Sequence, residues 1–204
     1  MRGFILHTAK AREEDLVVRI LTKDKVLTLY RFYGARHSYI NTGYLIDFVE
    51  EETLVSINRL RSVMQLPFDF LMDFEKMVTY KEFIRLLNNH LIDVERVDSF
   101  YFEMLEEIVK KLSFRDAKRV LIESYVKLLK KEGRLHPLNR CYFCEKEIKN
   151  KTALARAFLP AHEKCILSGG FEREKLKELF EENKTIFFDN KEIDKLWKII
   201  TLGF

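Results

Sequence analysis

The sequence predicts an α+β protein: an N-terminal OB-fold-like β-barrel, then an α-helical domain with an inserted segment of metal-ligand residues. Residues 1 to about 60 alternate short apolar runs with turn-forming residues, which is typical of short strands. From Pro67 onward the apolar residues recur every three or four positions, which is the period of a helix. All three cysteines then fall in one stretch, from Cys141 to Cys165. These observations place strands first, helices next and a metal-ligand segment near the end.

The composition supports a folded chain with a sizeable core. Hydrophobic residues make up 47% of the 204 residues, and with only 7 Gly and 3 Pro long disordered linkers are not expected. Lys and Arg number 36 against 32 Asp and Glu, a net charge of +4. Because this total is nearly balanced, any basic surface must come from the arrangement of the charges. The sequence shows no signal peptide and no membrane-length apolar run, so we expect a cytoplasmic protein that does not contact membranes.

Five short strands are expected in the barrel. In the second, Leu16, Val18 and Ile20 alternate with residues that point to the opposite face. The strands are expected at residues 4–8, 16–21, 26–33, 44–49 and 53–58. Five strands of this length suggest a small closed barrel such as an OB-fold, and the alternatives are a meander or an SH3-like barrel.

Residues 30–39 read Tyr-Arg-Phe-Tyr-Gly-Ala-Arg-His-Ser-Tyr and interleave aromatic with basic side chains. A small barrel that binds single strands combines stacking rings with a basic groove, so we expect a nucleic-acid-binding face here. Gly34 is expected to let the backbone turn sharply out of the third strand. The candidate DNA-binding residues are Arg31, Arg36, His37, Tyr39, Arg59 and Arg61. The alternative is that the rings are core residues and the arginines a solvated rim.

Three or four antiparallel helices with short links are expected to form a bundle after the barrel. Pro67 suits a first helical turn, and Asp98 is a candidate N-cap for the next helix. Residues 113–116 resemble a capping signal for a third helix, which Gly133 is expected to end.

The end of the chain is expected to add two more helices. The Ser-Gly-Gly run at 168–170 breaks the chain, and residues 172–182 have the pattern of an amphipathic helix. Residues 185–188 are expected to be a short extended piece, and Asn190 to cap a last helix.

Two ligand pairs, Cys141 with Cys144 and His162 with Cys165, have the spacing of a tetrahedral Zn²⁺ site. The two-residue gap lets a tight turn aim both side chains of a pair at one point. Four protein ligands leave no open position, so we expect structural rather than catalytic zinc. The alternatives are a disulfide or three merely buried thiols, and a reducing cytosol disfavours the disulfide.

These patterns predict four parts of the chain. They are an OB-fold DNA-binding domain at 1–66, a helical domain at 67–140, a zinc-binding segment at 141–170, and C-terminal helices at 171–204 that pack on the helical domain.

The chain resembles the RecO family of bacterial recombination mediators. The resemblance rests on Gly3-Phe-Ile-Leu6 in the first strand, on Gly34-Ala-Arg-His-Ser38 after the third, on the helical middle and on the inserted Cys-x-x-Cys segment. Residues 119–129 and 153–159 look most like the form found in the Campylobacter and Helicobacter group. The chain departs from the family where His37 replaces a second Arg and where His162 replaces a cysteine of many zinc-bearing members.

The resemblance implies a DNA repair and recombination mediator that is not an enzyme. Proteins of this family bind single- and double-stranded DNA, anneal complementary strands and help load RecA onto strands coated by single-strand-binding protein. Their partners are RecR and the acidic C-terminal tail of the single-strand-binding protein. In agreement, the sequence has no GxxxxGK[ST] phosphate loop.

Two other functions remain open at the level of sequence. One is a protein-binding adaptor with a structural zinc site and little intrinsic DNA activity. Its candidate residues are Lys110, Lys111, Arg115, Lys118 and Arg119, which can otherwise form a solvated helix face. The other is a zinc hydrolase of the nucleoside deaminase type, which needs three protein ligands, water and a His-x-Glu order that this segment lacks.

Overall fold

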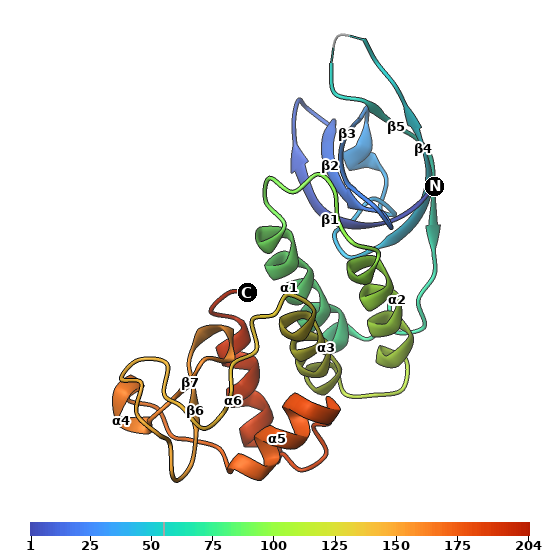
Figure 1. Cartoon of the computed structure of the whole chain (residues 1–204). Helices are drawn as coiled ribbons and strands as arrows, with labels where there is room; N and C mark the ends of the chain where they lie inside the picture. The colour runs from blue at the N-terminus through green and yellow to red at the C-terminus, as the bar shows by residue number, and fades with distance from the viewer. Residues whose placement is uncertain (55) are drawn as a thin grey trace. The chain divides into compact units, whose positions relative to one another are not determined.

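The computed structural model describes residues 1–54 and 56–204, which form two compact units. Unit 1 is Met1–Phe114 and holds a β-barrel with two helices. Unit 2 is Arg115–Phe204 and holds the remaining helices together with the cysteine-containing segment (Figure 1). The division into four parts at 66, 140 and 170 stays a prediction.

The barrel of unit 1 closes in the strand order β1-β2-β3-β5-β4 (Figure 1). Its strands are β1 (Arg2–Lys10), β2 (Leu16–Leu21), β3 (Val26–Arg31), β4 (Leu45–Glu51) and β5 (Arg59–Leu66). Neighbouring strands are antiparallel except for β3 and β5, which pair in parallel at Tyr30 and Arg59. The predicted α+β fold with an N-terminal five-stranded barrel is confirmed.

Alternating apolar side chains fill the barrel. Leu16, Val18 and Ile20 of β2 are buried, whereas Val17 and Arg19 between them are only partly buried. This alternation is the period of two that the sequence shows, and it fixes which face of β2 points inward. The core that results consists of Ile5, Leu16, Val18, Ile20, Leu29, Ile40, Ile46, Phe48 and Leu60.

The fifth strand was expected at 53–58, and this prediction is wrong for the residues that the structure describes, since β5 is Arg59–Leu66. Val55 of the expected strand lies outside the described residues. Thr53 and Asn58 hold a local loop, because the Thr53 amide donates to Asn58 Oδ1 at 3.1 Å and the Thr53 hydroxyl donates to the Ser56 carbonyl at 2.6 Å. Side chains of this type compete with strand pairing by bonding to the backbone nearby.

Two helices of unit 1, α1 (Phe74–His90) and α2 (Phe100–Leu112), contact β1. The prediction that a helix begins at Pro67 is wrong, since α1 begins after Asp73, whose carboxylate accepts from the Lys76 amide at 3.1 Å. Between β5 and α1 the chain turns, and Phe68 and Phe70 stack there with 5.5 Å between ring centroids.

Unit 2 is organised around α3, which contacts α5 and α6. Its elements are α3 (Ala117–Lys131), β6 (Ala153–Leu154), β7 (Pro160–Ala161), α4 (Glu163–Ile166), α5 (Arg173–Glu182) and α6 (Asn190–Ile200). Asp116 caps α3, as the signal at 113–116 indicates, and Gly133 follows that helix at a φ of 65°.

Two predictions in unit 2 need correction. The cap of α6 is Asp189 rather than Asn190, because Asp189 forms a capping box with Glu192. Residues 185–188 are not extended, since the chain turns at Ile186 and Phe187. Over the described part of the chain, no helix is both long and apolar enough to cross a bilayer.

Candidate metal centre and nucleic-acid interface

The first ligand pair of unit 2 sits in a tight turn that backbone hydrogen bonds close. The Glu145 amide donates to the Cys141 carbonyl at 2.9 Å, and the Cys141 amide donates to the Lys146 carbonyl at 2.9 Å. Glu145 takes a left-handed backbone conformation with a φ of 59°, which lets the chain reverse direction directly after Cys144. Both sulfur atoms of the pair are thereby presented on one side of the turn.

The second pair is brought back by a short hairpin. Strands β6 and β7 pair antiparallel, and β7 leads directly into His162, the residue before α4. Cys165 lies on α4, one helical turn after His162. Cys141, Ile148 and Ala161 form a small buried apolar cluster, which packs the turn against the hairpin.

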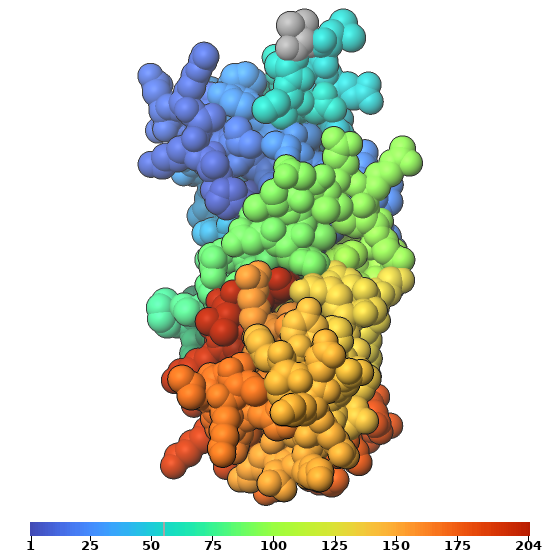
Figure 2. Space-filling model, turned by 60° about the vertical axis from the view of Figure 1, so that its left-hand side comes forward, coloured from blue at the N-terminus to red at the C-terminus, as the bar shows by residue number. Residues whose placement is uncertain are grey.

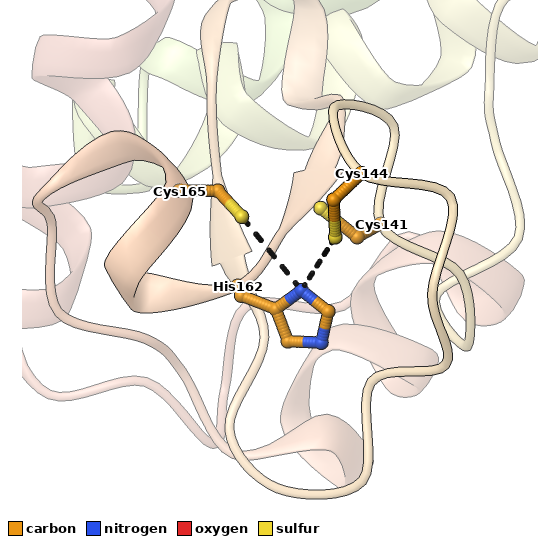
Figure 3. Close-up of side chains that lie close together, drawn as sticks. All are labelled: Cys141, Cys144, His162 and Cys165. Carbon is orange, nitrogen blue, oxygen red and sulfur yellow. Dashed lines mark hydrogen bonds between the residues drawn. The ribbon is translucent and has the colours of Figure 1, made fainter.

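The four ligand atoms converge on one point (Figure 3), all within 4.8 Å of one another. The Nδ1 atom of His162 lies 3.3 Å from Cys144 Sγ and 3.9 Å from Cys165 Sγ. His162 Nε2 lies 3.0 Å from the Glu147 carbonyl oxygen, so the ring donates on that side and offers Nδ1 toward the sulfurs. A backbone acceptor of this kind orients metal-binding histidines.

The surroundings favour an ionised sulfur at Cys141. Burial raises the pKa of this thiol, but the amides of Cys144, His162 and Phe143 point at its sulfur and outweigh burial, so the pKa falls to about 6. Burial and the neighbouring sulfurs of Cys144 and Cys141 raise the pKa of Cys165 to about 11. Sulfurs this close repel one another when ionised, and a bound cation removes that repulsion.

The cluster Cys141, Cys144, His162 and Cys165 can therefore hold a metal ion. Three sulfurs and one ring nitrogen are the donors of closed tetrahedral sites, and all three cysteines are free thiols in the structure. The disulfide considered for this segment is thus not formed.

On the barrel, the chain leaves β3 through a turn that Asp15 organises. The Asp15 carboxylate accepts from the Tyr30 hydroxyl at 2.6 Å and from the Tyr33 amide at 2.7 Å. These two bonds, the Tyr30 bond first, hold the pKa of Asp15 below its usual value. The turn places Tyr33 outside the barrel, at the surface.

The prediction that Gly34 supplies the sharp turn is wrong, because Tyr33 takes the left-handed conformation, with a φ of 52°. Gly34 is required for a different reason. A Cβ atom at this buried position would lie 3.0 Å from side-chain atoms of both Arg31 and Leu16. The glycine therefore lets the turn pack closely against the barrel wall.

Two exposed rings stand at the end of β3, each with an arginine over its face. The Arg36 guanidinium carbon lies 4.9 Å from the centroid of Tyr33, which is 56% exposed. The Arg59 guanidinium carbon lies 5.3 Å from the centroid of Phe32, which is 41% exposed. Arg59 comes from β5, so residues far apart in sequence build one surface. We call Phe32, Tyr33, Arg36 and Arg59 the ring–arginine cluster.

His37 and Tyr39 lie in the turn that follows, where their rings stack with centroids 4.9 Å apart and an angle of 26°. Both side chains are partly buried, and Tyr39 packs against the barrel core. These two predicted residues thus pack in the turn, and each stays partly accessible.

The other predicted arginines have partners within the barrel. Arg31 is partly buried and donates to the Leu60 carbonyl at 3.0 Å, which ties β3 to β5. Arg61 pairs with Glu51 at 2.5 Å, and Arg36 pairs with Glu14. Exposed pairs such as the last two contribute little stability, so a phosphate can replace the carboxylate at small cost. Arg31 therefore has a structural contact, and its role in DNA binding stays a prediction.

The list of candidate residues from the sequence missed Phe32 and Tyr33. In the strand predicted at 26–33 consecutive side chains point to opposite faces, so at least one of the adjacent rings of Phe32 and Tyr33 must lie outside the core. That signal was present in the sequence.

The basic residues proposed for an adaptor are mostly engaged within their own units. Lys111 pairs with Glu107, Lys118 with Asp194, and Arg115 makes two bonds to Glu123, at 2.7 and 2.8 Å. Arg119 donates to two backbone carbonyls, those of Thr185 and Phe188, in the turn between α5 and α6. Arg115 and Arg119 are therefore committed to internal contacts, whereas Lys111 and Lys118 form partly exposed ion pairs.

Comparison with known proteins finds one similarity, over the first part of the chain. A search of curated proteins finds no match. The family model described as RecO N terminal matches residues 1–71, which include all five strands of the barrel and the ring–arginine cluster. The matched part is about a third of the chain. Residues 1–71 are therefore similar to the N-terminal part of RecO proteins.

Proposed function

We propose that this chain is a RecO-type mediator of DNA repair and recombination. It binds single- and double-stranded DNA, anneals complementary strands and assists loading of RecA onto strands coated by single-strand-binding protein. The observation that carries the proposal is the ring–arginine cluster, which lies within the residues that match the RecO N-terminal family. RecR and the acidic C-terminal tail of the single-strand-binding protein are the proposed protein partners, and the proposed place of action is the cytoplasm.

In the proposed mechanism, bases stack on Phe32 and Tyr33 while arginines take the phosphates. Every base has a flat π-face, so stacking of this kind tolerates any sequence. Arg36 and Arg61 exchange Glu14 and Glu51 for phosphate oxygens, and the Arg59 guanidinium makes no ion pair with any described residue. Two strands whose charges are neutralised in this way repel each other less, which favours annealing without nucleotide hydrolysis.

We further propose that the four-ligand cluster binds Zn²⁺ as a structural ion. Cys141 and Cys144 hold it from the turn, and His162 and Cys165 hold it from the hairpin and α4. Bound zinc supplies a cross-link between these two segments and leaves no position for a reacting water. This makes the role of a zinc hydrolase the weaker interpretation. Arg115 bonds to the buried Glu123 and Arg119 bonds to backbone carbonyls, so the basic-patch adaptor is also the weaker interpretation.

Annealing of complementary oligonucleotides, with and without single-strand-binding protein and at two salt concentrations, tests the proposal. A mediator accelerates annealing of coated strands, and the acceleration falls with salt because phosphate contacts carry the binding. A chain that binds the acidic tail peptide but leaves annealing rates unchanged is an adaptor instead, and that result would contradict the proposal.

A further inference from the structure

A second group of exposed rings lies in unit 2, in the turn between the ligands Cys141 and Cys144. Tyr142 and Phe143 are each 54% exposed, and their rings meet edge to face with centroids 5.9 Å apart at 80°. His136 adds a third ring, 5.3 Å from that of Tyr142 at 69°. Ligation of a metal by a Cys-x-x-Cys turn places no demand on the two central side chains, so these exposed rings call for another role.

The rings of His136 and Tyr142 line an open cavity of about 720 Å³ in unit 2, and the Phe143 ring lies beside that of Tyr142. Its lining includes His136, Asn139, Arg140, Tyr142, Glu145 and Pro160. The volume falls in the range of small-ligand sites and is sufficient for a nucleotide. Figure 2 shows the segment that carries these residues, coloured yellow to orange, at the surface of unit 2.

The backbone around the cavity is fixed in advance. The Tyr142 amide donates to the Pro160 carbonyl at 2.8 Å, which joins the turn to β7. The Ile148 amide donates to the Asn139 carbonyl at 2.9 Å, so both sides of the turn are tied down. Rings on such a frame lose little conformational freedom when a ligand stacks on them.

The charge around the cavity suits a phosphate. The Arg140 guanidinium is 66% exposed and donates to Glu145, to its carbonyl at 2.9 Å and to its carboxylate at 3.1 Å. The carboxylate bond is an exposed ion pair that a phosphate can replace. Among the residues that line the cavity, the charged side chains are Arg140 and Glu145, so loss of the Glu145 contact leaves one cation facing the ligand.

We propose that this cavity is a second base-stacking site for single-stranded nucleic acid, separate from the ring–arginine cluster of the barrel. A base stacks on Tyr142 or Phe143, and the adjacent phosphate takes the place of the Glu145 carboxylate at Arg140. The lining offers rings, an amide and a guanidinium, as nucleotide sites do, rather than the continuous apolar groove that a helical peptide requires. The site goes beyond the proposed function, since it lies outside the residues that match the RecO N-terminal family.

Photo-crosslinking of the unsubstituted full chain tests this site without any mutation. A thymidine-rich single strand that carries 5-iodouracil is irradiated with the protein, and the crosslinked residues are mapped by mass spectrometry. We expect crosslinks at Tyr142 or Phe143 that an unlabelled strand competes away. Competition by an acidic, Phe-ended peptide alone, or crosslinks confined to residues 1–114, would overturn the proposal.

Substitutions give a second, quantitative test, made in the Phe32→Ala/Tyr33→Ala background so that the barrel contributes less. Tyr142→Ala or Phe143→Ala should weaken binding of the single strand about fivefold or more, because one stacked base is lost. Phe187→Ala is the matched control, since this ring of unit 2 is 56% exposed and does not line the cavity, and it should leave affinity unchanged.

A third substitution predicts a change of opposite sign. Glu145→Gln frees Arg140 and removes a negative charge, so it should tighten binding at low salt. Equal affinities for all these variants would contradict the second site. They would leave the barrel proposal intact, because that proposal is decided separately by the effect of the Phe32→Ala/Tyr33→Ala background itself.

Discussion

The guanidinium of Arg59 lies over the ring of Phe32, 5.3 Å from its centroid, and so links the start of β5 to the residue that follows β3. The two residues are far apart in sequence, yet the parallel pairing of Tyr30 with Arg59 brings their strands together. The relationship produces a ring that is exposed but held in place, which is the arrangement that a stacking platform requires.

Replacement of Arg36 by Ala should make binding of single strands less sensitive to salt. Each phosphate neutralised on a single strand contributes about −0.7 to the slope of log K against log salt, so the slope should become shallower by roughly that amount. Arg85→Ala is a matched control, because Arg85 is also exposed and paired with a carboxylate, that of Glu82. Fluorescence anisotropy over a salt series measures the slope for each variant, and equal slopes for the two variants would show that Arg36 is not part of the interface.

Replacement of Glu123 by Ala should destabilise unit 2 by about 3 kcal/mol, as is usual when one partner of a buried ion pair is removed. The Glu123 side chain is buried, accepts both bonds of Arg115 and also accepts from the Thr185 hydroxyl at 2.8 Å. Urea unfolding followed by fluorescence of the single Trp, at position 197, reports on this unit.

The control for that measurement is Glu174→Ala on α5, since Glu174 is 80% exposed and pairs with Lys177 at 3.7 Å. An exposed pair of this kind should change the free energy of unfolding by no more than about 0.5 kcal/mol. If the Glu123 variant behaves like this control, the buried pair does not stabilise the unit.

Replacement of Cys165 by Ser should abolish stoichiometric zinc binding, since a three-ligand site holds the ion much less tightly. Loss of the metal cross-link frees residues 141–170, which should then be cleaved rapidly by trypsin at their lysines. Lys164→Ala keeps all four ligands and serves as the control. Metal analysis measures the zinc content, and limited proteolysis measures the rate of cleavage. A Cys165 variant with full zinc content and unchanged cleavage would exclude this residue as a ligand.

Acid should weaken the turn after β3 through Asp15. The Tyr30 hydroxyl and the Tyr33 amide lower the pKa of this carboxylate in the folded chain. A lowered folded pKa contributes stability that is present above the unfolded value, about 3.9, and is lost as pH falls through the folded value. Asp15→Asn should therefore lower the thermal midpoint of unit 1 near neutral pH.

The pH dependence of that difference is the sharper part of the prediction. The gap between the unsubstituted chain and Asp15→Asn should shrink below about pH 4, as the carboxylate protonates. Tyr30→Phe removes one of the two donors and should reproduce part of the effect. Circular dichroism melts over a pH series measure this difference in thermal midpoint. A difference that is constant with pH would show that the charge of Asp15 does not contribute to stability.

The sequence was sufficient for the barrel and for the convergence of the metal ligands because both depend on local spacing. Strand β2 has the same bounds as predicted, since Leu16, Val18 and Ile20 alternate with partly buried residues along it. The pairs at 141 and 144 and at 162 and 165 converge because short gaps and one hairpin are enough to bring them together.

Features that depend on particular side-chain contacts were not predicted. Tyr33 rather than Gly34 takes the left-handed conformation because Asp15, on the segment before β2, binds its amide. Strand β5 begins at Arg59 because Thr53 and Asn58 use their side chains to hold the preceding loop. The pairing of Arg115 with Glu123 and of Arg36 with Glu14 likewise cannot be read from spacing alone.

The affinity of the Phe32→Ala/Tyr33→Ala variant for single-stranded DNA tests the central claim most directly. Both side chains are exposed, so the barrel should stay folded, and Phe74→Ala provides the control because this ring of unit 1 is 83% exposed and lies on α1. Loss of two stacked bases predicts an affinity at least about thirtyfold lower, on the order of 2 kcal/mol or more, at unchanged fold. An affinity equal to that of the control would contradict a nucleic-acid interface on this face of the barrel.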